Sequence, residues 1–188
     1  MIGAIETIYD GHRFRSRLEA RWAVFFNEMN IPWLYEPEGF QVGKWKYLPD
    51  FYLPKSKTWV EVKGGDESLR HDIERLEAVL DFDSPIPYMS ESRFDGSLNG
   101  LLILGNIPRL NDKWSVMHPI IQHHKGLSVA WITLNESVGT YHDYSDPRCD
   151  FNEITLEPRF TDTKPQCSLS KKAYNKARMA RFEHGEKP

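Results

Sequence analysis

Two carboxylates and a lysine are grouped in the short segment YLPDFYLPKSKTWVEVKGG, residues 47–65. The segment predicts a β-hairpin, because two alternating apolar runs flank a stretch that suits a four-residue turn at residues 54–57. Side chains alternate along a strand, so Glu61 and Lys63 share one face of the second strand. The same turn places Asp50 of the first strand directly opposite Glu61, with Cβ atoms about 4.5–5.5 Å apart.

Two like charges in this position repel each other, and the single charge of Lys63 does not balance both. A divalent cation would balance both carboxylates. Mg²⁺ is typically held by one or two carboxylates, while water and substrate phosphate supply the remaining ligands. The hairpin therefore predicts a site for Mg²⁺ or Mn²⁺ on Asp50 and Glu61. The alternative is an exposed polar face with a weak surface ion pair, and a one-residue slip in register would also separate the carboxylates.

A third carboxylate, Glu19, lies in the segment that precedes the hairpin. Apolar residues at helical spacing predict an amphipathic helix over residues 17–29. Ser16 and Glu19 match a capping box, in which the glutamate bonds back to the backbone at the start of the helix. The other interpretation is that Glu19 reaches the sheet and completes the metal site, and both stay open.

Basic residues occur around the start of this helix and again near residue 175. Arg13, Arg15 and Arg17 suit contacts to phosphates that flank a reacting bond, or form a solvated charged face. Residues 170–182 predict a basic helix capped by Ser170, which would serve as a clamp on the phosphate backbone or as a solvated terminal helix. The basic residues of that helix that we expect to contact nucleic acid are Lys171, Lys172, Lys176 and Arg178.

The remaining elements predict a mixed sheet flanked by helices, in the α/β or α+β class. A second helix begins at Asp66 or Ser68, and strands are expected at residues 33–35, 100–105 and 128–134. A turn-rich loop covers residues 83–99, and residues 135–169 show no periodicity and are expected to be loop. The sequence thus predicts a core domain over residues 1–134 and a loop-rich extension over 135–188.

The composition limits the classes of protein that the chain can belong to. No apolar run approaches the length that spans a bilayer, and a net charge of −3 argues against nonspecific coating of nucleic acid. The two cysteines form no CxxC pair, so a disulfide scaffold is not expected and a reducing cytoplasm is the expected compartment.

The hairpin and the helix before it together resemble the PD-(D/E)XK nuclease superfamily. Pro49-Asp50 on one strand and Glu61-Val62-Lys63 on the next match its signature, and the segment FRSRLEARWAVFFNEMNIPWLYEPEGF is similar to openings in Holliday-junction resolvases and in transposon nuclease subunits. The resemblance covers residues 13 to about 105. It implies a restriction-endonuclease-like core with the order helix, three strands, helix, strand.

The resemblance also implies the roles of individual residues. Asp50, Glu61, the peptide carbonyl of Val62 and Glu19 would bind Mg²⁺ or Mn²⁺, and Lys63 would assist the attacking water or the phosphate. The function expected on this basis is a metal-dependent endonuclease that hydrolyses DNA phosphodiester bonds. The alternative is a nucleic-acid-binding or assembly module that keeps the fold and does not cut. A second copy of the chain, or a protein bound through the C-terminal extension, stays open as a further partner.

Overall fold

The computed structural model describes residues 5–80, 100–110, 115–123, 127–134, 140–146, 154–157, 159–161 and 168–182. Its centre is a mixed eight-stranded sheet. The strands are β3 (Leu34–Tyr35), β6 (Phe51–Leu53), β7 (Thr58–Val62), β8 (Leu101–Leu104), β9 (Ser115–His123), β10 (Leu127–Thr133), β11 (Thr140–Asp146) and β12 (Arg159–Thr161). They follow the order β11-β10-β9-β8-β7-β6-β3, with β12 also paired to β9. β7 and β8 are parallel, and the other described pairs in this sheet are antiparallel.

Two further hairpins lie outside this sheet. β1 (Thr7–Tyr9) and β2 (His12–Phe14) are joined by Asp10 and Gly11, whose φ values of 48° and 77° suit the two-residue turn that an Asp-Gly pair favours. β4 (Phe40–Val42) and β5 (Trp45–Tyr47) form the second hairpin, which was not predicted from the sequence.

The described part of the chain contains four helices: α1 (Arg17–Glu28), α2 (Asp66–His71), α3 (Ile73–Leu80) and α4 (Ser168–Met179). The prediction of α1 is confirmed. The predicted second helix is interrupted at Asp72, and its N-terminal cap is Gly65 and not Asp66 or Ser68. α4 begins at Ser168, so Ser170 is a buried residue within the helix and not its cap. None of the described helices combines the length and the apolarity needed to cross a membrane.

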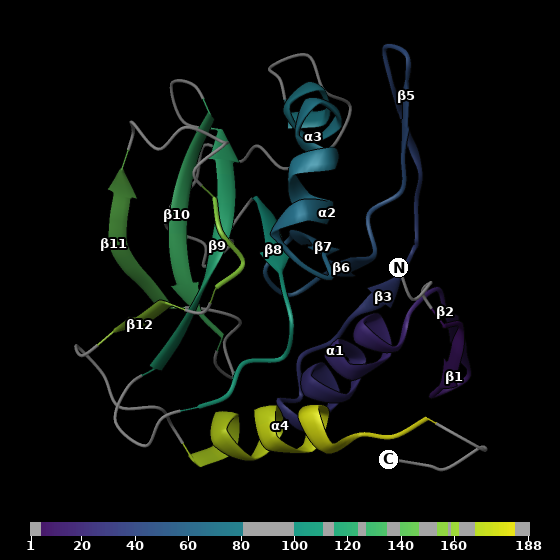
Figure 1. The fold of residues 1–188 in the computed structure, drawn as a ribbon, viewed down its shortest axis with the longest axis vertical. Coiled ribbons are helices and arrows are strands. Elements are labelled where there is room, and N and C mark those ends of the chain that lie inside the picture. Colours follow the sequence, from purple (N-terminus) through teal and green to yellow (C-terminus); the bar gives the residue numbers. More distant parts are fainter. Residues whose placement is uncertain are drawn as a thin grey trace.

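Helices cover both faces of the sheet, as Figure 1 shows. Along β8, Leu102 and Leu104 pack in a cluster with α1 and α4, whereas Leu101 and Ile103 pack in a second cluster with α2 and α3. All four side chains are buried, which confirms the prediction of a strand covered on both faces. The fold is therefore a mixed α+β fold around a mixed sheet.

The region expected to be loop differs from the prediction. β11 and β12 lie within residues 135–169, and β9 was not predicted as a separate strand. The sequence of β11, TYHDYSD, has no apolar alternation, so no pattern predicted this strand. β11 lies at the edge of the sheet and is held by its backbone pairing to one neighbour, β10. The expected division of the chain at residue 135 stays a prediction, and the loop expected over residues 83–99 lies outside the described residues.

Candidate active site

The register of the β6–β7 hairpin agrees with the prediction. Tyr52 lies opposite Trp59, and the rings of these two residues are 4.5 Å apart between centroids. The paired ladder ends at Phe51, so Asp50 stands one residue beyond its end. The carboxylate of Asp50 instead accepts a hydrogen bond from the backbone amide of Val62, at 2.7 Å, and so lies over the end of β7 beside Glu61.

Asp50 is almost completely buried, with 4% of its surface exposed. Its second carboxylate oxygen accepts a hydrogen bond from the guanidinium of Arg15 at 2.8 Å. Burial nevertheless raises the pKa of Asp50 well above its ordinary value, and the negative charges of Glu61 and Glu19 raise it further. Arg15 and the Val62 amide only partly offset this effect. The ionised form of Asp50 is therefore disfavoured, first by burial and then by its two acidic neighbours.

Glu61 is buried on the face of the sheet that α2 and α3 cover. One of its carboxylate oxygens accepts from the hydroxyl of Tyr47 at 2.9 Å, and the other accepts from Nζ of Lys63 at 2.6 Å. Lys63 donates to Asp72 as well. Burial alone would lower the pKa of Lys63, but Glu61 and Asp72 together raise it above its ordinary value. Lys63 is thus a buried ammonium group held between two carboxylates.

Asp72 and Arg75 complete this network, and sequence reasoning missed the role of both. Asp72 lies at the break between α2 and α3, where it accepts from Nη2 of Arg75 at 2.7 Å. Burial would raise the pKa of Asp72, but the bonds and charges of Lys63 and Arg75 lower it. The guanidinium of Arg75 also lies 5.6 Å from the ring centroid of Tyr47. The three-residue spacing of Asp72 and Arg75 on a helical segment was the available signal, and nothing in the sequence tied it to the hairpin.

Glu19 takes the first of the two roles that the sequence left open, at the start of the helix, and its role as a metal ligand stays a prediction. The Ser16 hydroxyl accepts from the Glu19 amide at 3.1 Å, which is the serine half of the predicted capping box. The Glu19 carboxylate accepts from the Ser16 hydroxyl at 2.6 Å and not from the Ser16 backbone amide, as the prediction had it. The other oxygen accepts from the hydroxyl of Tyr35 at 2.7 Å and from the amide of Arg15 at 3.1 Å. Glu19 is buried and its charge acts on Asp50, so the start of α1 forms one side of the site.

Arg15, one of the predicted phosphate-binding arginines, contacts the site carboxylates directly. It bridges Asp50 and Glu36, the latter at 2.6 Å, and its side chain is 55% exposed. Arg13 lies further out and pairs with Glu6 at 3.3 Å, and Arg17 is the first residue of α1. Arg15 therefore sits at the mouth of the site, between solvent and Asp50.

The basic residues of α4 lie elsewhere. Lys172 and Lys176 pair with Glu28, at 3.5 and 2.7 Å, and Arg178 donates to Asn175 at 3.2 Å. Glu28 is at the opposite end of α1 from Glu19, roughly 13 Å away along the helix axis. Lys171 belongs to the same helix, α4. The structure therefore does not bring these four residues together with the hairpin carboxylates.

The donors of the site fit a hard cation in type and in charge. Asp50 and Glu61 offer carboxylate oxygens on one face, and burial and the charges of Glu61 and Glu19 raise the pKa of Asp50. Within the described ranges, no group of three or more His, Cys, Asp or Glu side chains is arranged to hold an ion. A pair of carboxylates is nevertheless a common protein contribution to Mg²⁺ binding, with water and phosphate as the other ligands. The site thus fits Mg²⁺ or Mn²⁺ through this pair.

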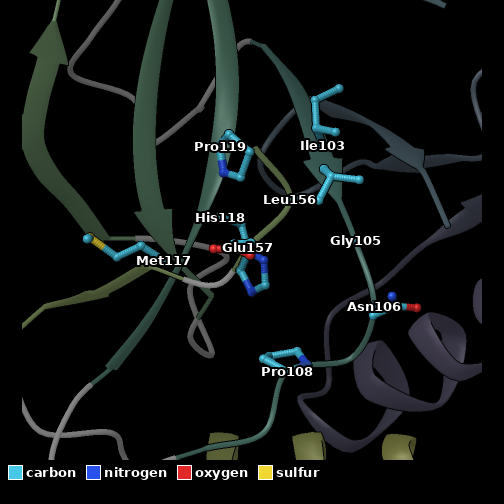
Figure 2. A pocket seen from close by; sticks show the side chains of 9 residues that line it. All are labelled: Ile103, Gly105, Asn106, Pro108, Met117, His118, Pro119, Leu156 and Glu157. Carbon is cyan, nitrogen blue, oxygen red and sulfur yellow. The ribbon is translucent and has the colours of Figure 1, made fainter. Parts of the chain in front are cut away.

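A small pocket lies apart from these residues. Figure 2 shows it between the ends of β8 and β9, and its lining contains none of the candidate site residues. It is formed by Ile103, Gly105, Asn106, Pro108, Met117, His118, Pro119, Leu156 and Glu157. His118 is buried there and shares a 2.7 Å hydrogen bond with the hydroxyl of Tyr174. The carboxylates of the hairpin therefore define the candidate active site, and the pocket does not.

The site residues come from three parts of the chain: the start of α1, the β6–β7 hairpin and the break between α2 and α3. Lys63 and Asp72 link the last two parts, and Arg15 and Asp50 link the first two. Comparison with known proteins adds no relative to this description, since no family model, no curated protein and no solved structure matches the chain.

Proposed function

We propose that the protein is a Mg²⁺- or Mn²⁺-dependent endonuclease that hydrolyses DNA phosphodiester bonds on a PD-(D/E)XK-like core. The observation that carries the proposal is the buried pair of Asp50 and Glu61 at the end of one hairpin, with Lys63 on the same face as Glu61. Burial and the negative charges of Glu61 and Glu19 raise the pKa of Asp50. A bound cation would favour the ionised form of Asp50, which burial and these charges disfavour.

The order of the elements supports the same proposal. α1 precedes the antiparallel pair β6–β7, the helical segments α2 and α3 follow, and β8 returns parallel to β7. This is the arrangement that the sequence resemblance implies for the core of the superfamily. The short strand β3 pairs with β6 and brings Tyr35 to Glu19, so the third carboxylate is held beside the hairpin.

In the proposed mechanism Asp50 and Glu61 would hold the metal ion, and the resemblance implies Glu19 and the peptide carbonyl of Val62 as further ligands. A bound divalent ion would supply an activated water at neutral pH and would stabilise charge on the phosphate. Lys63 stays protonated at neutral pH because its pKa is raised. It therefore acts as a donor to the phosphate or to the water and does not accept a proton.

Asp72 and Arg75 act on Lys63 as positioning residues. Asp72 accepts from both cations, and Arg75 lies 3.8 Å from the Glu61 carboxylate. This arrangement fixes the ammonium group of Lys63 within reach of Glu61 at 2.6 Å. A preorganised donor of this kind costs no rearrangement at the moment of reaction.

One observation favours a second function, that of a module on the same fold that binds nucleic acid without cutting it. Both hairpin carboxylates already have partners within the chain: Arg15 and the Val62 amide for Asp50, and Lys63 and Tyr47 for Glu61. Because both buried carboxylates have hydrogen-bond partners within the chain, the fold does not require a metal ion. The two functions differ in whether a divalent ion binds to the pair and in whether DNA is cut.

A cleavage assay tests the proposal. Supercoiled plasmid is incubated with the protein and Mg²⁺ or Mn²⁺, and the variants Asp50→Asn and Glu61→Gln are compared with Glu67→Gln, which removes an exposed carboxylate in α2. We expect the first two variants to lose activity by more than about 100-fold and the third to cut like the unchanged chain. Full cleavage by Asp50→Asn or Glu61→Gln would refute the assignment. Absence of cleavage by the unchanged chain on plasmid and single-stranded DNA would favour the non-cutting module.

A further inference from the structure

The β4–β5 hairpin projects from the body of the molecule beside α3 (Figure 1). Its two strands pair with each other and, in the part of the chain that the structure describes, with no strand of the main sheet. We call residues 39–48 the arm. One face of the arm, with Phe40, Val42 and Tyr47, packs on the second core cluster, and the opposite face, with Gln41 and Lys46, is exposed.

The base of the arm is fixed to the candidate active site. Phe40 and Tyr47 face each other across the base, and both are buried. The ring of Phe40 packs edge-on against Trp59 with centroids 5.2 Å apart, and the hydroxyl of Tyr47 donates to Glu61 at 2.9 Å. The direction of the arm is therefore set by the same strand that carries Glu61.

The tip of the arm is basic and aromatic. Val42 pairs with Trp45 around a two-residue turn whose first residue, Gly43, has a φ of 55°. Lys44 and Lys46 are exposed, and Nζ of Lys44 lies 4.7 Å from the ring centroid of the half-buried Trp45. The arm contains two lysines and no acidic residue, in a chain whose net charge is −3.

We propose that the arm enters a groove of duplex DNA and positions the duplex over Asp50 and Glu61. The inference rests on the proposed nuclease function and names the part of the chain that binds its substrate. The major groove admits a two-stranded β-ribbon, and lysines on such a ribbon reach the phosphates that line it. Lys44 and Lys46 contact phosphates, and Trp45 contacts the sugars or base edges between them. At about 3.3 Å per residue, Lys44 is roughly 10 Å along the strand from the Tyr47 contact with Glu61, so DNA on the arm also lies at the site.

Binding is measured by fluorescence anisotropy with a fluorescein-labelled duplex oligonucleotide in EDTA, over a series of salt concentrations. The double variant Lys44→Gln/Lys46→Gln is compared with Lys55→Gln/Lys57→Gln. The control removes the same charge from the turn of the β6–β7 hairpin, at the far end of those strands from Asp50 and Glu61. Removing one lysine from a phosphate should flatten the slope of log affinity against log salt by about 0.9, so the slope of the arm variant should be flatter by about 1.8 and the control should match the unchanged chain.

Trp45→Ala should weaken binding about tenfold with little change in the salt slope, since its contact is not ionic. Thermal melting of each variant checks folding, and Trp45→Phe restores an aromatic ring and should recover binding if the arm is intact. Arm variants that keep the unchanged affinity and salt slope would overturn the inference, as would equal effects in the control. Cutting of plasmid by the unchanged chain, measured separately, decides the nuclease proposal. If the unchanged chain cuts plasmid and the arm variants bind DNA as well as the unchanged chain does, only the inference about the arm is refuted.

Discussion

Asp50 carries a charge that the folded protein disfavours in the absence of a metal. Its pKa is raised by burial and by the charges of Glu61 and Glu19, so ionising this side chain costs more free energy in the folded protein than in the unfolded chain. A substitution that removes the charge and keeps the shape should relieve this cost. Arg15 retains Glu36 as a partner, and an asparagine oxygen can still accept from the Val62 amide.

The first prediction is that Asp50→Asn raises the melting temperature at pH 7 in EDTA. A group whose pKa is raised by folding stabilises the protein below its unfolded pKa, and this contribution is lost as the pH rises through its folded pKa. The advantage of Asp50→Asn should therefore be small near pH 4 and grow towards pH 8. Thermal melting over this pH range measures the difference in melting temperature between the variant and the unchanged chain. A variant that is less stable at pH 7 would show that Arg15 and the Val62 amide fully offset the cost of the Asp50 charge.

The second prediction concerns Lys63, whose removal would leave Glu61 buried beside Asp72 without its main cation. Lys63→Met should lower the free energy of unfolding by about 3–5 kcal/mol, as expected when one partner of a buried ion pair is removed. Lys176→Met removes one member of a more exposed pair with Glu28 and should cost at most about 1 kcal/mol. Urea denaturation of both variants gives the comparison, and equal costs would contradict the burial of Lys63.

At the scale of elements, the docking of α4 against α1 joins the two ends of the described chain. Tyr174 of α4 is buried against Phe25 of α1, with ring centroids 4.4 Å apart, and Ala173 and Ala177 allow the helices to approach. His118 of β9 bonds to the Tyr174 hydroxyl and packs edge-on against Trp22. This contact ties both helices to the sheet through a neutral imidazole.

The third prediction follows from His118. Burial lowers its pKa to about 3, whereas an unfolded histidine titrates near 6.5. The unfolded chain therefore binds more protons between these values, and stability contributed by the neutral imidazole is lost as the pH falls from 6.5 towards 3. From pH 6.5 to pH 5 the free energy of unfolding should fall by about 2 kcal/mol from this group alone. His118→Gln should lack this component in urea denaturation at the two pH values, and an unchanged pH dependence would refute it.

Local signals made several elements predictable. A capping box and helical spacing predicted α1, the turn length predicted the register of β6 with β7, and a short apolar run predicted β8. β9 and β11 were missed because their sequences show no apolar alternation, although both pair with their neighbour β10. β12 was missed because it has only three residues and pairs with β9, which lies much earlier in the chain. The arm was missed because its two strands are only three residues long, too short for an alternating pattern to stand out.

The residues of the site that local register groups together were predictable, and those that packing brings together were not. Asp50, Glu61 and Lys63 were expected together, since they share a hairpin whose register is fixed locally. Asp72 and Arg75 were missed because their approach to Lys63 depends on how α2 and α3 pack on the sheet. A contact set by packing between distant segments leaves no periodic trace in the sequence.

For the molecule as a whole, metal binding and stability are linked. If the hairpin pair binds Mg²⁺ or Mn²⁺ in the folded state alone, the metal at one hundred times its dissociation constant should stabilise the protein by about 2.7 kcal/mol. This fourth prediction is measured by thermal melting with and without metal. Asp50→Asn and Glu61→Gln should abolish the shift, and Glu67→Gln should retain it. Ca²⁺ should also stabilise, with little cleavage, because the site offers hard oxygen donors.

The packing of α4 on α1 has a consequence for the order in which parts of the chain can pack during synthesis. A ribosome completes the carboxylates and lysine of the hairpin by residue 63, but α4 spans Ser168–Met179. Until that helix has emerged, the face of α1 that carries Phe25 has no cover from Tyr174. Glu19, at the other end of α1, is held by Ser16, Tyr35 and Arg15, which the ribosome has already made. A nascent chain would thus carry the complete hairpin for over a hundred residues of synthesis before α4 could cover α1.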